Sequence, residues 1–254
     1  MLLTVLDSGS QGNCYLFEAK EETLIIELGI NFKNTLKGLN FDLTKVVGAL
    51  VSHEHQDHCK GVKDALKMGV DVYMSKGTHK GLNNYETRNN RREIESNLIK
   101  YISHGKEFSL GKFRIMPFNV KHDVIEPLGF LINHPDSGTT MFITDSYYCE
   151  YKFENLDNII IEANYSDEII EQHVFNGKLP SYRYDRTITS HMSLKTCKMF
   201  LAANDLKRCR NILLIHLSDS NSNAVQFQKE VAECTGKNVV IASKGISVSF
   251  GHPF

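Results

Sequence analysis

The stretch His53-Glu54-His55-Gln56-Asp57-His58 holds the side chains of this chain that are best suited to chemistry. Three imidazoles and the carboxylate of Asp57 lie within six positions. Neutral imidazole and carboxylate are the ligands that suit zinc and neighbouring first-row metals. A solvated, histidine-rich turn is the alternative explanation, because short metal motifs also occur by chance. Taken alone, the stretch predicts a metal site and nothing about its use.

The segments on either side of this cluster indicate where it lies in the fold. Residues 46–51 form a short, Val-rich apolar run, which is typical of a buried strand. Residues 61–68 have apolar side chains at helical spacing and end at Gly69, so they predict a helix. The cluster therefore lies at a strand-to-helix junction, where irregular backbone can direct several side chains to one point.

Further polar residues stand at the ends of other predicted strands. His122, Asp145 and His216 follow the apolar runs 112–120, 140–144 and 211–215. Loops at a sheet edge converge, so these side chains are expected to join the cluster. His191 precedes Ser193, a good N-cap for a helix over residues 194–203. The remaining histidines lack such a context and are expected to be structural: His79, His104, His134, His173 and His252.

The other predicted elements begin as a meander of short strands and then alternate between strands and helices. The further strands are predicted at residues 2–6, 14–18, 23–27, 70–74, 98–102, 128–133, 158–161, 238–242 and 246–250. The further helices are predicted at residues 76–84, 167–175 and 223–234. No repeat, low-complexity tract or linker interrupts the chain, so we expect one domain over residues 1–254.

Composition bounds the class of protein. The chain has 254 residues, 41% of them hydrophobic and 23% charged, as in an ordinary globular protein. The net charge of -1 gives no global attraction to nucleic acid, so a basic binding surface must be local. Six cysteines without C-x-x-C spacing indicate reduced thiols. No signal peptide and no run of about 20 apolar residues is present, so we expect a cytoplasmic protein without a membrane partner.

Three segments contain candidates for substrate binding. The Gly-rich loop 7–13 can bring backbone amides to a phosphate, although a plain turn is the alternative. The arginines that follow the helix at 76–84 can bind phosphate or lie on a solvated face. Segment 180–186 interleaves tyrosine with arginine, which suits base stacking and phosphate pairing but also rim packing. The candidate residues are Ser8, Ser10, Arg91, Arg92, Arg183 and Arg186.

The cluster at 53–58, followed in order by His122, Asp145 and His216, resembles the metallo-β-lactamase superfamily over nearly the whole chain. The resemblance implies an α/β (α+β) fold, a four-layer αββα sandwich of two mixed β-sheets flanked by helices. It also implies two divalent metal ions, Zn²⁺ or Mn²⁺. By resemblance His53, His55 and His122 hold one metal, Asp57, His58 and His216 hold the other, and Asp145 bridges them. The family usually has Asp at the position of Glu27, a residue that in relatives supports the ligands without binding metal.

Features of the resemblance point to one branch of this family. Asp57 is retained, as in two-metal phosphodiesterases and nucleases, whereas branches that hydrolyse β-lactams tend to alter the motif. Residues 2–61 and 122–130 look like the YycJ/WalJ-type proteins, a group associated with 5′-to-3′ DNA exonuclease activity. His191-Met192-Ser193 and Ile215-His216-Leu217-Ser218 are similar to the closing motifs of ribonuclease Z, in which the counterpart of His191 is proposed to protonate the leaving oxygen. The long arm of that enzyme has no counterpart here, which disfavours transfer-RNA processing.

We therefore expect a two-metal-dependent phosphodiesterase or nuclease, foremost a 5′-to-3′ DNA exonuclease that uses a metal-bridging hydroxide. Asp57 and His191 are the expected catalytic residues. The alternatives are a cyclic-nucleotide phosphodiesterase and a thioester or lactone hydrolase; a non-catalytic binding protein is disfavoured because no ligand is lost. The expected partner is DNA or a small nucleotide. A homodimer also remains open, although no stretch indicates an interface.

Overall fold

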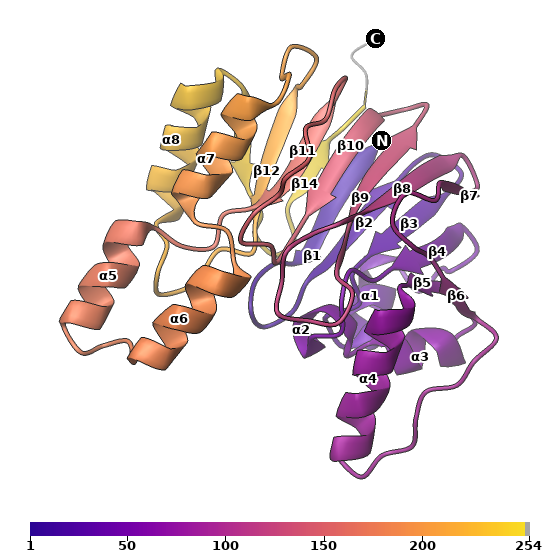
Figure 1. Ribbon diagram of the computed structural model, residues 1–254. Coiled ribbons are helices and arrows are strands. Elements are labelled where there is room, and N and C mark those ends of the chain that lie inside the picture. Colours follow the sequence, from indigo (N-terminus) through magenta and orange to yellow (C-terminus); the bar gives the residue numbers. More distant parts are fainter. Residues whose placement is uncertain (252–254) are drawn as a thin grey trace.

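Two β-sheets face each other at the centre of the molecule, and helices cover their outer faces (Figure 1). The computed structural model describes residues 1–251. Its four layers confirm the predicted αββα sandwich. His252, expected to be structural, lies outside the described residues.

The first sheet combines an antiparallel half with a parallel half. Its seven strands within residues 1–251 are, in spatial order, β14 (Ser247–Ser249), β1 (Leu2–Asp7), β2 (Cys14–Glu18), β3 (Thr23–Ile26), β4 (Val46–Leu50), β5 (Val72–Met74) and β6 (Ile99–Tyr101). Strands β14 to β3 pair antiparallel, and β3 to β6 pair parallel. Parallel neighbours need crossover connections, which the helices of this half supply.

The second sheet has the same mixed character. Its seven strands in the described part of the chain are β13 (Asn238–Ile241), β12 (Asn211–Ile215), β11 (Asn158–Glu162), β10 (Gly138–Ile143), β9 (Leu128–His134), β8 (Phe113–Asn119) and β7 (Phe108–Leu110). Strands β13 to β10 are parallel, and β10 to β7 are antiparallel. The carboxyl ends of β10, β11 and β12 therefore meet at one edge, where open α/β sheets bind ligands.

Helices flank each sheet. Those that follow strands of the first sheet are α1 (Phe32–Gly38), α2 (Gln56–Cys59), α3 (Val62–Lys67) and α4 (Lys76–Arg88). Those of the second half are α5 (Asp167–Phe175), α6 (Ser181–Ser190), α7 (Leu194–Ala203) and α8 (Ala224–Thr235). Helices α7 and α8 cover the second sheet, while α5 and α6 project from its end (Figure 1). Among residues 1–251, no helix has the length and apolar character of a membrane span.

Three apolar clusters hold these layers together. The central cluster lies between the sheets and contains the fully buried rings of Tyr15, Phe130 and Phe142. Strand β8 shows the alternation that produces it, because Phe113 and Ile115 are buried whereas the intervening Arg114 is exposed. Two further clusters join each sheet to its helices. All six cysteines are free, as their spacing predicts.

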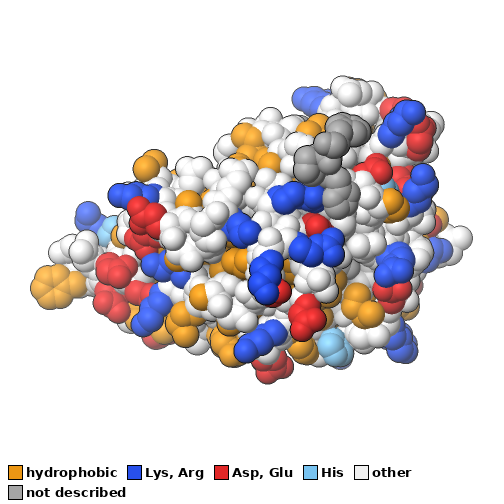
Figure 2. Space-filling view, turned by 90° about the horizontal axis from the view of Figure 1, so that it is seen from above, with side chains coloured by type: hydrophobic (Ala, Val, Ile, Leu, Met, Phe, Trp, Pro, Cys, Tyr) orange, Lys and Arg blue, Asp and Glu red, His pale blue; other side chains and the backbone are white. Residues whose placement is uncertain are grey.

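Charged side chains of both signs are interspersed on the face seen from above in Figure 2. This distribution agrees with the net charge of -1. A basic surface that binds nucleic acid must therefore be local, as the net charge predicts.

Several elements differ from the sequence prediction. Segment 180–186 was expected only as an aromatic and basic stretch, but it starts helix α6, which follows Pro180. Helix α1 and strand β7 were not predicted, because each is short and weakly periodic. Helix α4 continues past its predicted end at Asn84 to Arg88. The cluster at 53–58 was expected to be irregular, yet its second half forms the single turn α2.

We predict that Phe142→Ala strongly destabilises the fold. The Phe142 ring is fully buried, packs edge-on against Tyr15 at 5.7 Å and lies 6.3 Å from the Phe130 ring. Removing it leaves a cavity between the sheets, so the free energy of unfolding should fall by about 3–5 kcal/mol. Urea unfolding followed by circular dichroism measures the change. Phe175→Ala is the control, because that ring is 91% exposed and its loss should change stability by less than about 0.5 kcal/mol.

Candidate metal centre

Three side chains at the centre follow strands with an unusual backbone conformation. Glu27, Asp145 and His216 come after β3, β10 and β12 and have φ values of 64°, 46° and 54°. Non-glycine residues rarely adopt this left-handed region, and such outliers concentrate at functional sites. Here the conformation turns each side chain out of its sheet toward one point between the two sheets.

The predicted cluster enters the same point through the loop after β4 and the turn α2. His55 is the N-cap of α2, and the turn then presents Asp57 and His58. Close packing of Gly29 holds α2 in place, since any Cβ at that glycine would collide with the backbone of Asp57. The junction predicted from sequence therefore brings the cluster to the sheet edge.

The predicted ligands form two groups that share one carboxylate. In the first group, ligand atoms of His53, His55, His122 and Asp145 all lie within 4.8 Å of one another. In the second group, the same holds for Asp57, His58, Asp145 and His216. A third group, which contains Asp145, Glu162, His191 and His216, overlaps with the second. The structure thus brings together all seven residues that were predicted to bind metal.

Asp145 lies at the centre of this arrangement and is only 1% exposed. Its Oδ2 is 2.7 Å from Nε2 of His58 and 3.2 Å from Nε2 of His53. Its Oδ1 is 3.2 Å from Nδ1 of both His191 and His216. Each oxygen therefore faces a different pair of imidazoles, as a shared ligand would.

Hydrogen bonds orient the imidazoles so that lone pairs face inward. Nδ1–H of His122 donates to the backbone oxygen of Ser190 at 2.9 Å, which leaves Nε2 without a proton, 3.1 Å from Nδ1 of His55. In His53, Nδ1 pairs with the hydroxyl of Ser52 at 2.9 Å, and the buried Nε2 has no hydrogen-bond partner. Metal-binding histidines are oriented in this way through their other ring nitrogen.

The electrostatics of the first group favour neutral imidazoles. Burial lowers the pKa of His53 well below its usual value and lowers the pKa of His55 to about 4. Burial also lowers the pKa of His122. Neutral imidazole is the form that binds metal, so this group fits a cation without first losing protons at neutral pH.

The second group concentrates negative charge, because it contains the carboxylates of Asp57 and Asp145. Burial raises the pKa of Asp145, but His216 and His58 outweigh burial and hold it well below its usual value. Conversely, burial opposes protonation of His216, yet Asp145 and neighbouring groups raise its pKa to about 9. Buried carboxylates need nearby positive charge. In this structure protons on the imidazoles supply that charge, and a divalent cation suits the same role.

Two glutamates support the centre from behind. The Glu27 carboxylate lies 3.5 Å from Nδ1 of His58 and accepts from the amide of Ser52 at 3.3 Å, so it contacts a predicted ligand without belonging to a ligand group. Glu162, which is fully buried, lies 2.7 Å from Nδ1 of His191 and 3.3 Å from Nδ1 of His216. Glu162 was missed by sequence reasoning, although it ends an apolar strand just as Asp145 does.

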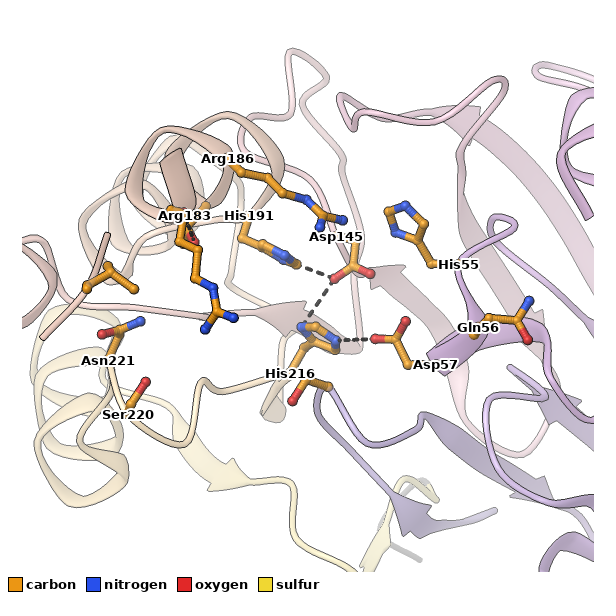
Figure 3. Close-up of a pocket in the computed structure, with 13 residues that line it drawn as sticks. His55, Gln56, Asp57, Asp145, Arg183, Arg186, His191, His216, Ser220 and Asn221 are labelled. Carbon is orange, nitrogen blue, oxygen red and sulfur yellow. Dashed lines mark hydrogen bonds and ion pairs between the residues drawn. The ribbon is translucent and has the colours of Figure 1, made fainter. Parts of the chain in front are cut away.

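A cavity of about 540 Å³ opens beside the centre (Figure 3). Among the predicted catalytic and substrate-binding residues, those that line it are Ser10, Asp57, Arg183, Arg186 and His191. Ser8 does not line it; its hydroxyl is partly buried, 2.9 Å from the Tyr15 hydroxyl and 3.1 Å from the amide of His216.

The remaining candidates lie away from this cavity. Arg91 and Arg92 are exposed in the loop after α4 and do not line the cavity, and Arg91 pairs with Glu86 at 3.7 Å. Four of the histidines expected to be structural have other partners: His79 with Tyr101, His104 with Asn119, His134 with Glu22, and His173 with Asn221.

Comparison with known proteins identifies similar sequences. Residues 31–217 match the family described as the Beta-lactamase superfamily domain. Exodeoxyribonuclease WalJ of Streptococcus pneumoniae serotype 2 (strain D39 / NCTC 7466) is 27% identical over 259 residues, which cover 97% of this chain and 91% of that protein. Exodeoxyribonuclease YycJ of Bacillus anthracis is 28% identical over 260 residues, which cover 96% and 90% of the two chains.

Solved structures share the fold at lower identity. The metallo-beta-lactamase fold protein YhfI from Bacillus subtilis superposes with a TM-score of 0.71 at 19% identity and covers 97% of this chain and 98% of its own. The short form of human tRNase Z has a TM-score of 0.63 at 14% identity, with coverage of 99% and 100%. These likenesses show that the four-layer sandwich is a metallo-β-lactamase fold.

We predict that Asp145→Asn reduces metal binding by the purified protein. The substitution keeps the shape of the side chain but removes the charge shared by both ligand groups, so zinc or manganese content should fall clearly below that of the unaltered protein. Inductively coupled plasma mass spectrometry after dialysis gives the content. Asp64→Asn, at an exposed residue of α3, is the control and should leave it unchanged. An Asp145→Asn protein with full metal content would contradict the shared-ligand assignment.

Proposed function

Because the chain belongs to the beta-lactamase superfamily, we propose that it is a metal-dependent nuclease, and more specifically a 5′-to-3′ DNA exonuclease. The names of the WalJ and YycJ relatives, which match along nearly the whole chain, support this choice. The observation that carries it is His191, held by a buried carboxylate at the wall of the cavity beside both ligand groups.

The residues present fit two divalent cations. We assign His53, His55 and His122 to one cation, Asp57, His58 and His216 to the other, and Asp145 to both. Three buried atoms without a hydrogen-bond partner support the assignment: Nε2 of His53, Nδ1 of His58 and Oδ1 of Asp145. When bound, such cations stabilise charge on a phosphoryl group and lower the pKa of a water so that it attacks near neutral pH. Zinc and manganese both accept this set of nitrogen and oxygen ligands.

His191 is placed to act as a general acid. Its Nδ1–H donates to Oε1 of Glu162 at 2.7 Å, and the same nitrogen lies 3.2 Å from Oδ1 of Asp145. Burial lowers the pKa of His191, but Glu162 and Asp145 outweigh burial and raise it well above the usual value. Nε2 has no hydrogen-bond partner within residues 1–251, and the side chain is 23% exposed at the cavity wall. The imidazolium can therefore donate its Nε2 proton to the cavity.

The reaction that follows is hydrolysis of a phosphodiester. Water forms a bond to phosphorus, the bond from phosphorus to the leaving oxygen breaks, and Nε2 of His191 protonates that oxygen. The proton released by water passes to solvent, from which His191 is recharged. Glu162 keeps the ring oriented and its charge stabilised, which makes Glu162 a positioning residue.

A cyclic-nucleotide phosphodiesterase is the second candidate. The cavity volume of about 540 Å³ favours it, because pockets of roughly 300–1,000 Å³ hold small ligands. The two candidate functions predict different effects of salt on substrate affinity. Binding of a DNA strand should weaken steeply with salt, whereas a singly charged cyclic nucleotide should show little slope.

A substrate panel with purified, metal-supplemented protein tests the proposed function. The panel contains end-labelled single-stranded and duplex DNA, RNA, cyclic mononucleotides and a thioester. We expect stepwise shortening of DNA from its 5′ end. Cleavage of cyclic nucleotides alone would favour the second candidate, and no phosphodiester cleavage with zinc or manganese would overturn both.

We predict that His191→Ala retains metal but slows cleavage. Loss of a positioned general acid should lower kcat about 10²–10⁴-fold. Rates on a 5′-labelled strand and metal content are measured on the same preparation. His104→Ala serves as control, because His104 caps the amide of Asn119 away from the cavity. Loss of metal in His191→Ala, or an unchanged rate, would refute the general-acid role.

A further inference from the structure

A second cavity lies next to the first, on the other side of the candidate metal centre. It has a volume of about 480 Å³ and shares His55 and Gln56 with the cavity of about 540 Å³. We call them the α4 cavity and the α6 cavity, after the helix that walls each one. The two cavities therefore adjoin at His55 and Gln56, and we call the surface that runs along both of them the path.

Helix α4 presents one face to its cavity. Gly81, Asn84, Tyr85 and Arg88 line it, at the spacing that places residues on one side of a helix. Gly81 permits close packing, because a Cβ there would collide with the side chain of Glu54. The guanidinium of Arg88 is exposed and makes no ion pair or hydrogen bond among residues 1–251. This face therefore offers an aromatic ring, an amide and an uncommitted cation.

Helix α6 presents a comparable face to the α6 cavity. Arg183, Arg186 and Thr187 line it at helical spacing. Arg186 is engaged, since its Nε lies 3.6 Å from Asp123. The side chain of Arg183 has no partner among the described residues, and it points into the cavity toward Ser220 (Figure 3). Arg183 is thus the uncommitted cation on this side.

Acidic groups that face the path are already engaged. Asp123 pairs with Arg186 and lies 3.3 Å from His122. Oε1 of Glu54 accepts from the amide of Ile125 at 3.1 Å, while its Oε2 is buried without a hydrogen-bond partner, and burial raises the pKa of this carboxyl, which favours its neutral form. Asp57 belongs to the centre itself. Arg88 and Arg183 remain as the free charges at the two ends of the path, which suits a polyanion that spans it.

We propose, resting on the proposed nuclease function, that one DNA strand occupies both cavities with a defined direction. His191 lines the α6 cavity and not the α4 cavity, so the leaving oxygen must lie on the α6 side. When the bond from phosphorus to O3′ breaks, the leaving oxygen belongs to the nucleotide on the 5′ side of the cleaved phosphate. The 5′-terminal nucleotide therefore sits in the α6 cavity with its 5′-phosphate on Arg183, and the rest of the strand runs along α4 to Arg88.

In this direction of binding, Arg183 recognises the 5′-phosphate at the end of the strand. The unaltered protein should cleave 5′-phosphorylated strands about tenfold more efficiently than 5′-hydroxyl strands, since a phosphate pairs strongly with arginine. Arg183→Ala should bring the ratio of the two kcat/KM values close to one, and Arg183→Lys should restore part of it. Arg114→Ala is the matched control, because Arg114 lies on β8 and lines neither cavity.

A binding measurement without metal tests the α4 side independently of activity. Fluorescence anisotropy gives the affinity of the metal-free protein for a labelled dinucleotide and for a strand of about twelve nucleotides. Arg88→Ala should weaken binding of the long strand more than binding of the dinucleotide. For the long strand, it should also reduce the slope of log affinity against log salt concentration by about 0.7. Circular dichroism confirms that each variant is folded.

The outcomes separate this inference from the proposed function. If the unaltered protein digests no DNA, the proposed function fails and this inference with it. If it digests DNA, the inference alone is overturned by an unchanged phosphate preference in Arg183→Ala, by equal effects of Arg88→Ala on both ligands, or by digestion of a strand whose 5′ end is blocked.

Discussion

The buried carboxylate of Asp145 is the constraint on which the centre depends. A carboxylate with 1% exposure is costly unless positive charge or hydrogen-bond donors surround it. Four imidazole nitrogens lie within 3.2 Å of its two oxygens. These imidazoles come from both sheets, so satisfying one carboxylate fixes how the two halves of the sandwich meet.

The mixed sheets supply the geometry that this constraint needs. At one edge of the second sheet, the parallel strand β11 ends at Glu162, and Asp145 and His216 follow the ends of β10 and β12. Strands β3 and β4 of the first sheet end opposite them and lead to Glu27 and the cluster at 53–58. The large buried rings between the sheets keep the two edges in register. A rigid scaffold of this kind holds irregular backbone in conformations that a free loop would not keep.

The four carboxylates at this edge fall into two pairs with different positions. Asp57 and Asp145 face the space between the ligand groups, whereas Glu27 and Glu162 lie behind and orient His58, His191 and His216. The same arrangement relates the centre to its surroundings. Helices α4 and α6 each wall one of the two cavities that adjoin it.

The sequence by itself, through its resemblance to a known family, predicted the layered fold class and the residues that gather at the candidate centre. Apolar strands followed by His or Asp were visible in the order of residues, because each signal is local. Tertiary structure alone decided how these residues divide into groups around Asp145, and it showed Glu162, whose role depends on His191 far along the chain. It also showed that Arg183 lines a cavity beside the centre, whereas Arg91 and Arg92 line neither cavity. The sequence shows which residues follow each strand. It does not show the distances between the ends of different strands, because these are set only when the two sheets pack together.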